Sequence, residues 1–177
     1  DLRLSIHSWM DPGFWILVAA IGLPFVAAAV TPLLHRVIGD RVGYVGAAVA
    51  VVSFGLLGTQ IGTEGTVSRP WVPSLDVAVR LHADGLALLF GLLASGIGVL
   101  IFAYATSYMR GQPNLGQFYM ALLAFMGSIL GVALAADLLL LFLFWELTSV
   151  SSFILIGYHT EDAESRYSAR MAMVITV

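Results

Sequence analysis

The chain has 177 residues, of which 59% are hydrophobic and only 11% are charged, and its formal net charge is −3. Soluble domains carry about 25% charged residues, so this composition excludes an ordinary soluble domain and indicates a protein whose solvent is the lipid bilayer. The eight basic residues are scattered arginines that form no nucleic-acid footprint, and the sequence has no cysteine for disulfides, iron–sulfur clusters or thiolate metal sites.

Two apolar runs near the start of the chain are each long enough for a transmembrane helix, which needs roughly 20 apolar residues. Residues 14–34 form the first predicted span, in which Pro24 and Pro32 are tolerated as they often are in membrane helices. After a short polar turn at residues 35–41, residues 42–61 form the second span. Its glycine, alanine and valine content allows close helix contact.

A more polar stretch follows at residues 63–84. Apolar side chains alternate with polar or small ones between Leu75 and Leu81, which is the period of a β-strand. We therefore expect a small extramembrane β-hairpin between the second and third spans.

Three further spans are predicted at residues 85–108, 118–136 and 138–158, and a sixth helix begins at about residue 166. Asp84 is well placed to cap the N-terminus of the third span. Because a helix abandoned in lipid would leave backbone groups unsatisfied, we expect the sequence to be part of a longer protein. The predicted fold is an all-α, polytopic transmembrane helix bundle with one small β-hairpin.

The arginines predict the orientation of the bundle, because positively charged residues favour the cytoplasmic side of a membrane. An N-terminus outside the cell places five of the arginines on the cytoplasmic side and leaves three on the side of the hairpin. We therefore expect a multi-pass protein of the cytoplasmic membrane with its N-terminus outside. The five arginines are Arg36, Arg41, Arg110, Arg166 and Arg170.

Glu146 carries the predicted chemistry. It lies about 12 Å from the start of its span, well inside a hydrocarbon core of ~30 Å. An ionised carboxylate that faced lipid there would be costly, so the side chain must face the bundle, pair with a cation or take up a proton. Desolvation favours the protonated carboxyl and a nearby cation favours the ionised one, and a carboxyl between these influences can load and release a proton. The alternative is a static ion pair that ties two helices together.

Three hydroxyl groups follow Glu146 in the same helix. Ser149 lies one turn along on the same side, where it is placed to hold a water molecule beside the acid. Thr148 and Ser151 point elsewhere, and we expect their hydroxyl groups to bond back to the helix backbone or to neighbouring helices.

The remaining candidates have both structural and functional interpretations. Asp137 stands at a span boundary, either as a second residue for ion coupling or as a polar residue at a helix start. His82 and Asp84 are candidates for a site of ion access or for turn and capping roles. Gly127 and Gly131 form a small-xxx-small pair, which predicts a helix contact and no catalytic role.

Residues 144–158, Phe-Trp-Glu-Leu-Thr-Ser-Val-Ser-Ser-Phe-Ile-Leu-Ile-Gly-Tyr, resemble the fifth helix of the A-type subunit of the Mrp multisubunit Na⁺/H⁺ antiporters. Residues 165–169 and 173–177 resemble the start of that family's sixth helix. Residues 82–86 and 107–110 resemble segments of the wider antiporter-like group, which includes the proton-pumping membrane subunits of respiratory complex I.

The resemblance implies that Glu146 is the family's essential fifth-helix glutamate, paired with a lysine on the seventh helix. This sequence contains no lysine, so the partner is expected in a part of the protein beyond it. The family often has a lysine early in the sixth helix, where this chain has Arg170 followed by Met171, and Arg170 is a candidate to take its place.

The resemblance predicts the N-terminal membrane part of a secondary transporter subunit that exchanges Na⁺ for H⁺, rather than an enzyme. Its expected partners are the other membrane subunits of an Mrp-type complex and the lipid bilayer, with no cofactor and no nucleic acid. One alternative is a proton-pumping membrane subunit of a redox-driven complex, either an NADH dehydrogenase or a membrane hydrogenase. Copurified flavin or iron–sulfur protein would favour that alternative. Another is a scaffold in which Glu146 is only structural.

Overall fold

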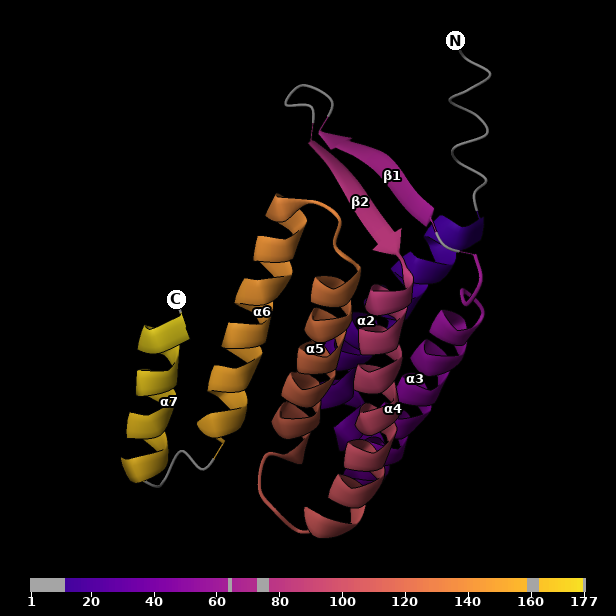
Figure 1. Ribbon diagram of the computed structural model, residues 1–177. Helices are drawn as coiled ribbons and strands as arrows, with labels where there is room; N and C mark the ends of the chain where they lie inside the picture. Colours follow the sequence, from indigo (N-terminus) through magenta and orange to yellow (C-terminus); the bar gives the residue numbers. More distant parts are fainter. Residues whose placement is uncertain (1–11, 64, 73–76, 159–162, 177) are drawn as a thin grey trace.

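A computed structural model describes residues 12–63, 65–72, 77–158 and 163–176. Its helices stand side by side as a bundle, with a two-stranded hairpin at one end (Figure 1). Arg3, one of the three arginines that the predicted orientation leaves on the side of the hairpin, lies outside the described residues. The elements are, in order, α2 (Pro12–Ile38), η1 (Gly39–Arg41), α3 (Val42–Gly58), β1 (Gly65–Val72), β2 (Val77–Ala83), α4 (Gly85–Tyr108), α5 (Leu115–Leu134), α6 (Leu138–Ile156) and α7 (Ala163–Thr176).

The connection between the first two helices is shorter than the polar turn predicted at residues 35–41. α2 continues to Ile38, and the chain reverses through the single 3₁₀ turn η1, where Gly39 has a φ of 60°. α3 ends at Gly58, earlier than predicted, because the following residues make tighter i→i−3 bonds and Gly62 turns with a φ of 84°. A hydrogen bond from Ser53 Oγ to the Ala20 carbonyl, 3.2 Å long, joins the two helices.

Glycines on α3 allow the close helix contact that the sequence predicted. A Cβ added to Gly46 would lie 2.4 Å from Phe102 Cδ1 of α4, and one added to Gly43 would lie 2.2 Å from Thr106 Oγ1. Only hydrogen fits at these two positions, so α3 and α4 pack with their backbones close together.

The predicted β-hairpin is confirmed. β1 and β2 pair antiparallel, with Thr66 opposite His82 and Arg69 opposite Val79. One face of the hairpin packs on the bundle, where Leu81 is buried and Arg69 is only 8% exposed. The Arg69 guanidinium carbon lies 5.0 Å from the centre of the Phe14 ring at the start of α2, a cation–π contact that holds the hairpin against the helix.

Two aspartates begin helices on the hairpin side. Asp84 accepts a hydrogen bond from the Ala87 amide at 2.7 Å, so α4 begins at Gly85 as predicted. Asp137 accepts one from the Leu139 amide at 2.9 Å and begins α6. Each side chain satisfies an amide that the helix itself leaves without a partner.

Both ends of α5 differ from the prediction of residues 118–136. The helix begins at Leu115, directly after Asn114, which adopts a left-handed conformation with a φ of 59°. It ends at Leu134 because the chain then pairs with β2, where the Ala136 amide donates to the Arg80 carbonyl at 2.9 Å. α7 begins at residue 163, three residues before the predicted start, and runs antiparallel beside α6 (Figure 1).

Four helical segments in the described part of the chain are long and apolar enough to cross a membrane: Pro12–Gly58, Gly85–Tyr108, Leu115–Leu134 and Leu138–Ile156. The first of them contains both α2 and α3, which fold back on each other at η1. Many large apolar side chains are exposed on the outside of the bundle. This pattern is typical of a multi-pass membrane protein, whose outer surface contacts lipid.

Candidate functional site

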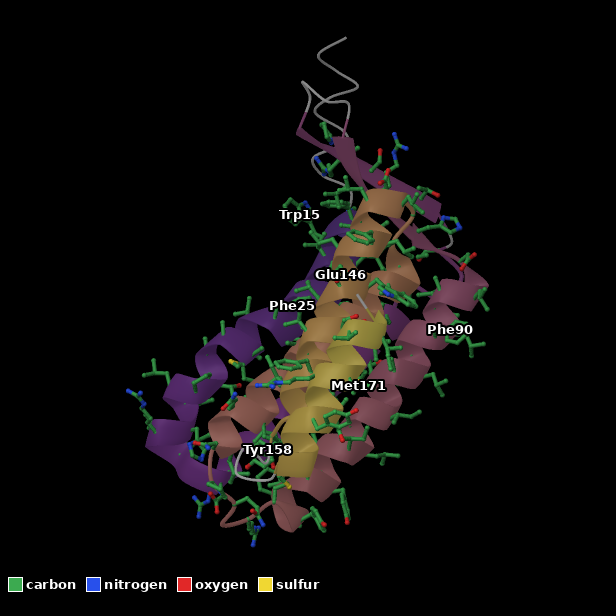
Figure 2. All side chains as sticks on the ribbon, turned by 90° about the vertical axis from the view of Figure 1, so that its left-hand side faces the viewer. Trp15, Phe25, Phe90, Glu146, Tyr158 and Met171 are labelled. Carbon is green, nitrogen blue, oxygen red and sulfur yellow. The ribbon has the colours of Figure 1, made fainter. Side chains whose placement is uncertain are left out.

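Glu146 lies near the middle of α6, between the level of Trp15 towards the hairpin and that of Tyr158 at the opposite end (Figure 2). The side chain is partly exposed on the surface of the bundle. Several of its neighbours on the helix are apolar and exposed, among them Phe142 at 63% and Trp145 at 52%, while Ser149 one turn along is buried. A carboxyl group therefore stands within an apolar outer surface.

The rotation of α6 that places Glu146 there is fixed by Phe144. The Phe144 ring lies directly over Gly131 of α5 and stacks on Phe25 of α2, with 6.2 Å between the two ring centres. Successive helical residues are about 100° apart around the axis, so Glu146 points about 200° away from Phe144. Glu146 therefore faces away from α5.

This contact confirms the predicted role of the glycine pair. Gly131 makes room for Phe144, and Gly127, one turn earlier on α5, lies against Phe25 and Pro24 of α2. The two glycines therefore bring α2, α5 and α6 together behind the acid.

No hydrogen bond or ion pair joins Glu146 to another side chain within the described residues. Arg170 on α7 is exposed and makes no ion pair with the acid in that part of the chain. Asp137 is nine residues away, about 13.5 Å along the helix axis, and its Oδ2 lies 3.9 Å from Arg80 Nη1. The structure thus separates Glu146 from Asp137 and gives the latter a capping and pairing role.

The three hydroxyl groups after Glu146 differ in how firmly the helix holds them. Thr148 Oγ1 donates to the Trp145 carbonyl at 2.6 Å and Ser151 Oγ to the Leu147 carbonyl at 2.8 Å, so both bond back to the backbone as predicted. Ser149 Oγ also points at the Trp145 carbonyl, but at 3.3 Å. This longer bond leaves the buried Ser149 hydroxyl better able to serve a second partner beside Glu146.

Two polar contacts at the hairpin were missed by the sequence analysis. Thr66 Oγ1 lies 2.6 Å from His82 Nδ1, and Arg80 pairs with Asp137 across two elements. The alternation between Leu75 and Leu81 identified no partner strand, so the register that places Thr66 opposite His82 did not follow from it. Among the residues that the structure describes, no group of three or more histidine or acidic side chains is placed to hold a metal ion.

Two families match this chain. Residues 71–119 match the family described as NADH-ubiquinone oxidoreductase (complex I), chain 5 N-terminus, and residues 135–177 match NADH:quinone oxidoreductase/Mrp antiporter, TM. Glu146 lies in the second matched segment.

Individual relatives agree with these families. The chain is 40% identical to the A1 subunit of a Na⁺/H⁺ antiporter of Staphylococcus aureus and 39% identical to that of Staphylococcus haemolyticus, in each case over 92% of this chain and 21% of the relative. A solved structure of the Mrp complex from Dietzia sp. DQ12-45-1b superposes on 79% of this chain and 16% of the matched chain, with a TM-score of 0.70 and 35% identity. The chain thus spans about a fifth of the length of the curated relatives, and its resemblance to the A-type subunit of the Mrp antiporters is confirmed.

Proposed function

We propose that this relative of the A-type subunit of the Mrp antiporters is part of a multisubunit cation/proton antiporter, in which Glu146 is a proton-relay carboxyl for the exchange of Na⁺ and H⁺. The proposal draws on the names of the relatives, the A1 subunit of a Na⁺/H⁺ antiporter and an Mrp complex. It extends their activity to this chain through the acid in the matched membrane segment.

The observation that carries the proposal is the position of Glu146. It lies mid-helix on the face of α6 that turns away from α5, within an apolar surface. Lipid at this face would leave a carboxylate unsolvated at a cost of a few kcal/mol, so the acid requires protein or a water-filled path beside it. The face of α6 that carries Glu146 is therefore suited to ion transfer, and it is poorly suited to direct contact with lipid.

A cation from another helix would complete the site. The sequence contains no lysine, and Arg170 makes no ion pair with Glu146 in the described part of the chain. We infer that the partner is a lysine on a further helix of the subunit, packed against the outer face of α6. Pairing with a lysine would lower the free-energy cost of the ionised Glu146 carboxylate and leave the protonated carboxyl accessible.

Further features of the proposal concern the assembly and the membrane. The partners are the other membrane subunits of an Mrp-type complex, and the membrane is the cytoplasmic one, with the N-terminus and the hairpin outside. The first residues of α2 and the hairpin lie at the same end of the bundle (Figure 1). Arg36, Arg41 and Arg110 lie at helix ends on the opposite side, which the positive-inside rule assigns to the cytoplasm.

A second candidate function is a proton-pumping membrane subunit of a redox-driven complex. It is favoured by the match of residues 71–119 to chain 5 of complex I. Both functions use the same acid, and the driving partner distinguishes them. Flavin or iron–sulfur protein in the purified complex would favour the pump, and proton movement driven by added Na⁺ without a redox substrate favours the antiporter.

The test replaces Glu146 with Gln in the complete complex and measures Na⁺-dependent proton movement in everted membrane vesicles. Gln keeps the volume and hydrogen bonding of Glu but cannot take up a proton, so transport should fall to background while the subunits still assemble on native gels. Asp137→Asn, the same change at the cap of the same helix, should keep most of the transport. Full transport by Glu146→Gln would overturn the proposal, and loss of assembly would favour a static ion pair, which is strongly destabilised by removal of one partner.

A further inference from the structure

A groove follows the line along which α4 and α5 meet on the outer surface of the bundle. Its middle is a hollow of about 310 Å³ lined by apolar side chains of both helices, among them Phe90, Ile101 and Ile129. A second hollow of about 450 Å³ shares Ile101 and continues to Tyr108 at the end of α4. α6 and α7 lie on the other side of α5 (Figure 1), so the groove is separate from the surface that carries Glu146.

One face of α4 forms the wall of this groove through both hollows. Phe90, Ile97, Ile101, Tyr104 and Tyr108 follow one another at helical spacing, which places them on the same side of the helix. From Ile97 to Tyr108 the helix rises about 16 Å. This length is about half of a hydrocarbon core of ~30 Å, so this part of the groove has the depth of the acyl chains in one leaflet.

The shape of the groove fits an acyl chain better than a further helix. Small residues lie deep in it, Ala94 and the buried Gly98, whereas the rim has large side chains such as Leu93 and Ile97, which are 53% and 46% exposed. A helix with its side chains is about 10–12 Å across, but an acyl chain is one methylene wide. Where helices of this bundle pack closely, a small residue such as Gly131 stands at the contact itself. The large rim side chains keep a helix out of the groove and leave room for a chain of methylenes.

The groove ends beside aromatic and basic residues. Tyr104 and Tyr108 stack with 5.3 Å between their ring centres, and tyrosines are enriched where a bilayer meets water. Arg110 follows in the turn after α4, where it is exposed and makes no ion pair with the described residues. Arg41 of η1 stands at the same end, and Asp40 is the one acidic residue of η1 and this turn. Positive charge therefore exceeds negative charge at the end of the groove, which favours the phosphate of an anionic lipid.

We propose that the groove between α4 and α5 is a binding site for one anionic phospholipid. An acyl chain lies along α4 between Ile97 and Tyr108, and the phosphate lies beside Arg110. The lipid belongs to the leaflet at the Arg110 end of the bundle, whichever side of the membrane that is. The inference does not rest on the proposed antiport function, because lipid binding is measured without transport.

The test places the complete complex in phosphatidylcholine vesicles that contain a trace of phosphatidylglycerol with a photoactivatable diazirine in its acyl chain. After illumination, mass spectrometry identifies the labelled residues. Labels should concentrate on the residues of α4 and α5 that line the groove. A phosphatidylcholine probe with the same acyl chain should label them several-fold less. Equal labelling by the two probes, or even labelling over the whole outer surface, would mean annular lipid only and would overturn the proposal. A groove that neither probe labels would mean that protein covers it, which overturns the proposal as well.

Two pairs of variants assign the acyl chain and the phosphate separately. Ala94→Phe fills the groove and should lower its labelling several-fold, whereas Ala103→Phe adds the same bulk at an exposed position about 180° around α4 and should not. Arg110→Gln should remove the preference for phosphatidylglycerol, and Arg36→Gln, the same change at the end of α2, should keep it. Unchanged labelling in Ala94→Phe would contradict the groove as the site of the chain. If that variant fails to assemble, Arg110→Gln still decides, because a preference that survives it overturns the proposed site.

Discussion

The ring of Phe144 on α6 occupies the space that a side chain on Gly131 of α5 would need: a Cβ added there would lie 2.3 Å from Phe144 Cγ. Phe25 of α2 stacks on the same ring, with 6.2 Å between the two ring centres. Three helices thus meet at one aromatic side chain, two residues before Glu146. This contact determines which way the acid points, so it connects the packing of the bundle with the proposed transport.

We expect Gly131→Ala to push α6 away from α5. Overpacking of a tight contact costs about 1–3 kcal/mol, so the complex should unfold at a lower temperature in detergent and transport should fall with it. Gly127→Ala should be milder, because its nearest neighbour is Phe25 Cε2 at 3.0 Å.

Two further variants distinguish the loss of the Gly131–Phe144 contact from the effect that any glycine-to-alanine change has on a helix. Gly55→Ala on α3 is the matched control, since no atom lies within 4 Å of an added Cβ there and alanine favours the helix. Combining Gly131→Ala with Phe144→Leu should restore part of the lost stability. If Gly131→Ala and Gly55→Ala have the same unfolding temperature, the close contact is not a determinant of the packing.

A second prediction concerns Asp137, whose two oxygens have separate roles. Asp137→Asn keeps the cap on the Leu139 amide but loses the ion pair with Arg80. That pair is partly exposed, so its loss should lower the free energy of unfolding by no more than about 1 kcal/mol, and high salt should remove the difference. Asp137→Ala should lose roughly 1 kcal/mol more, because the cap goes as well. Unfolding of the purified complex at low and at high salt measures the contribution of the ion pair and that of the cap. If Asp137→Asn and Asp137→Ala lower the free energy of unfolding equally, the capping role is contradicted.

The parts of the fold that follow from local chemistry were predictable from the sequence. α4 begins directly after Asp84 and ends at Tyr108, as predicted, because a capping side chain and a glycine-containing turn mark its two ends. The hairpin was predictable from its alternation. The polar groups of residues 35–41 suggested a longer loop than the structure has, because charged side chains at a helix end can extend into solvent while the backbone stays helical.

Contacts between distant residues were not predictable. The chain after α5 pairs with β2 through the Ala136 amide and the Arg80 carbonyl, and nothing in two alanines indicates such a partner. The face of Glu146 was not predictable for another reason. The acid and the hydroxyl groups of α6 are spread around an otherwise apolar helix, so its sequence has no periodicity that distinguishes a buried from an exposed side. Only the packing of Phe144 on Gly131 shows which way the acid points.

A third prediction tests the arrangement of the bundle in the membrane. The chain has no cysteine, so a single introduced thiol reports one position if the other subunits are also free of reactive thiols. Ser68→Cys lies on β1 and Gln112→Cys lies in the turn between α4 and α5, at opposite ends of α4. With the N-terminus outside, an impermeant thiol reagent should label residue 68 in intact cells and residue 112 only after permeabilisation. The reverse pattern would invert the orientation, and labelling of both in intact cells would contradict a spanning α4.

The last prediction concerns the hydroxyl next to the acid. Ser149 lies one turn from Glu146 and is held by its own helix at 3.3 Å, whereas Ser151 is held at 2.8 Å. If Ser149 positions a water molecule for proton transfer to Glu146, Ser149→Ala should slow Na⁺-dependent proton movement in everted vesicles several-fold without loss of assembly. Ser151→Ala is the matched control: it removes the same atom from a buried serine of the same helix that faces Phe144 rather than Glu146, and it should transport at the wild-type rate. Equal rates in the two variants would mean that the Ser149 hydroxyl serves the helix backbone alone.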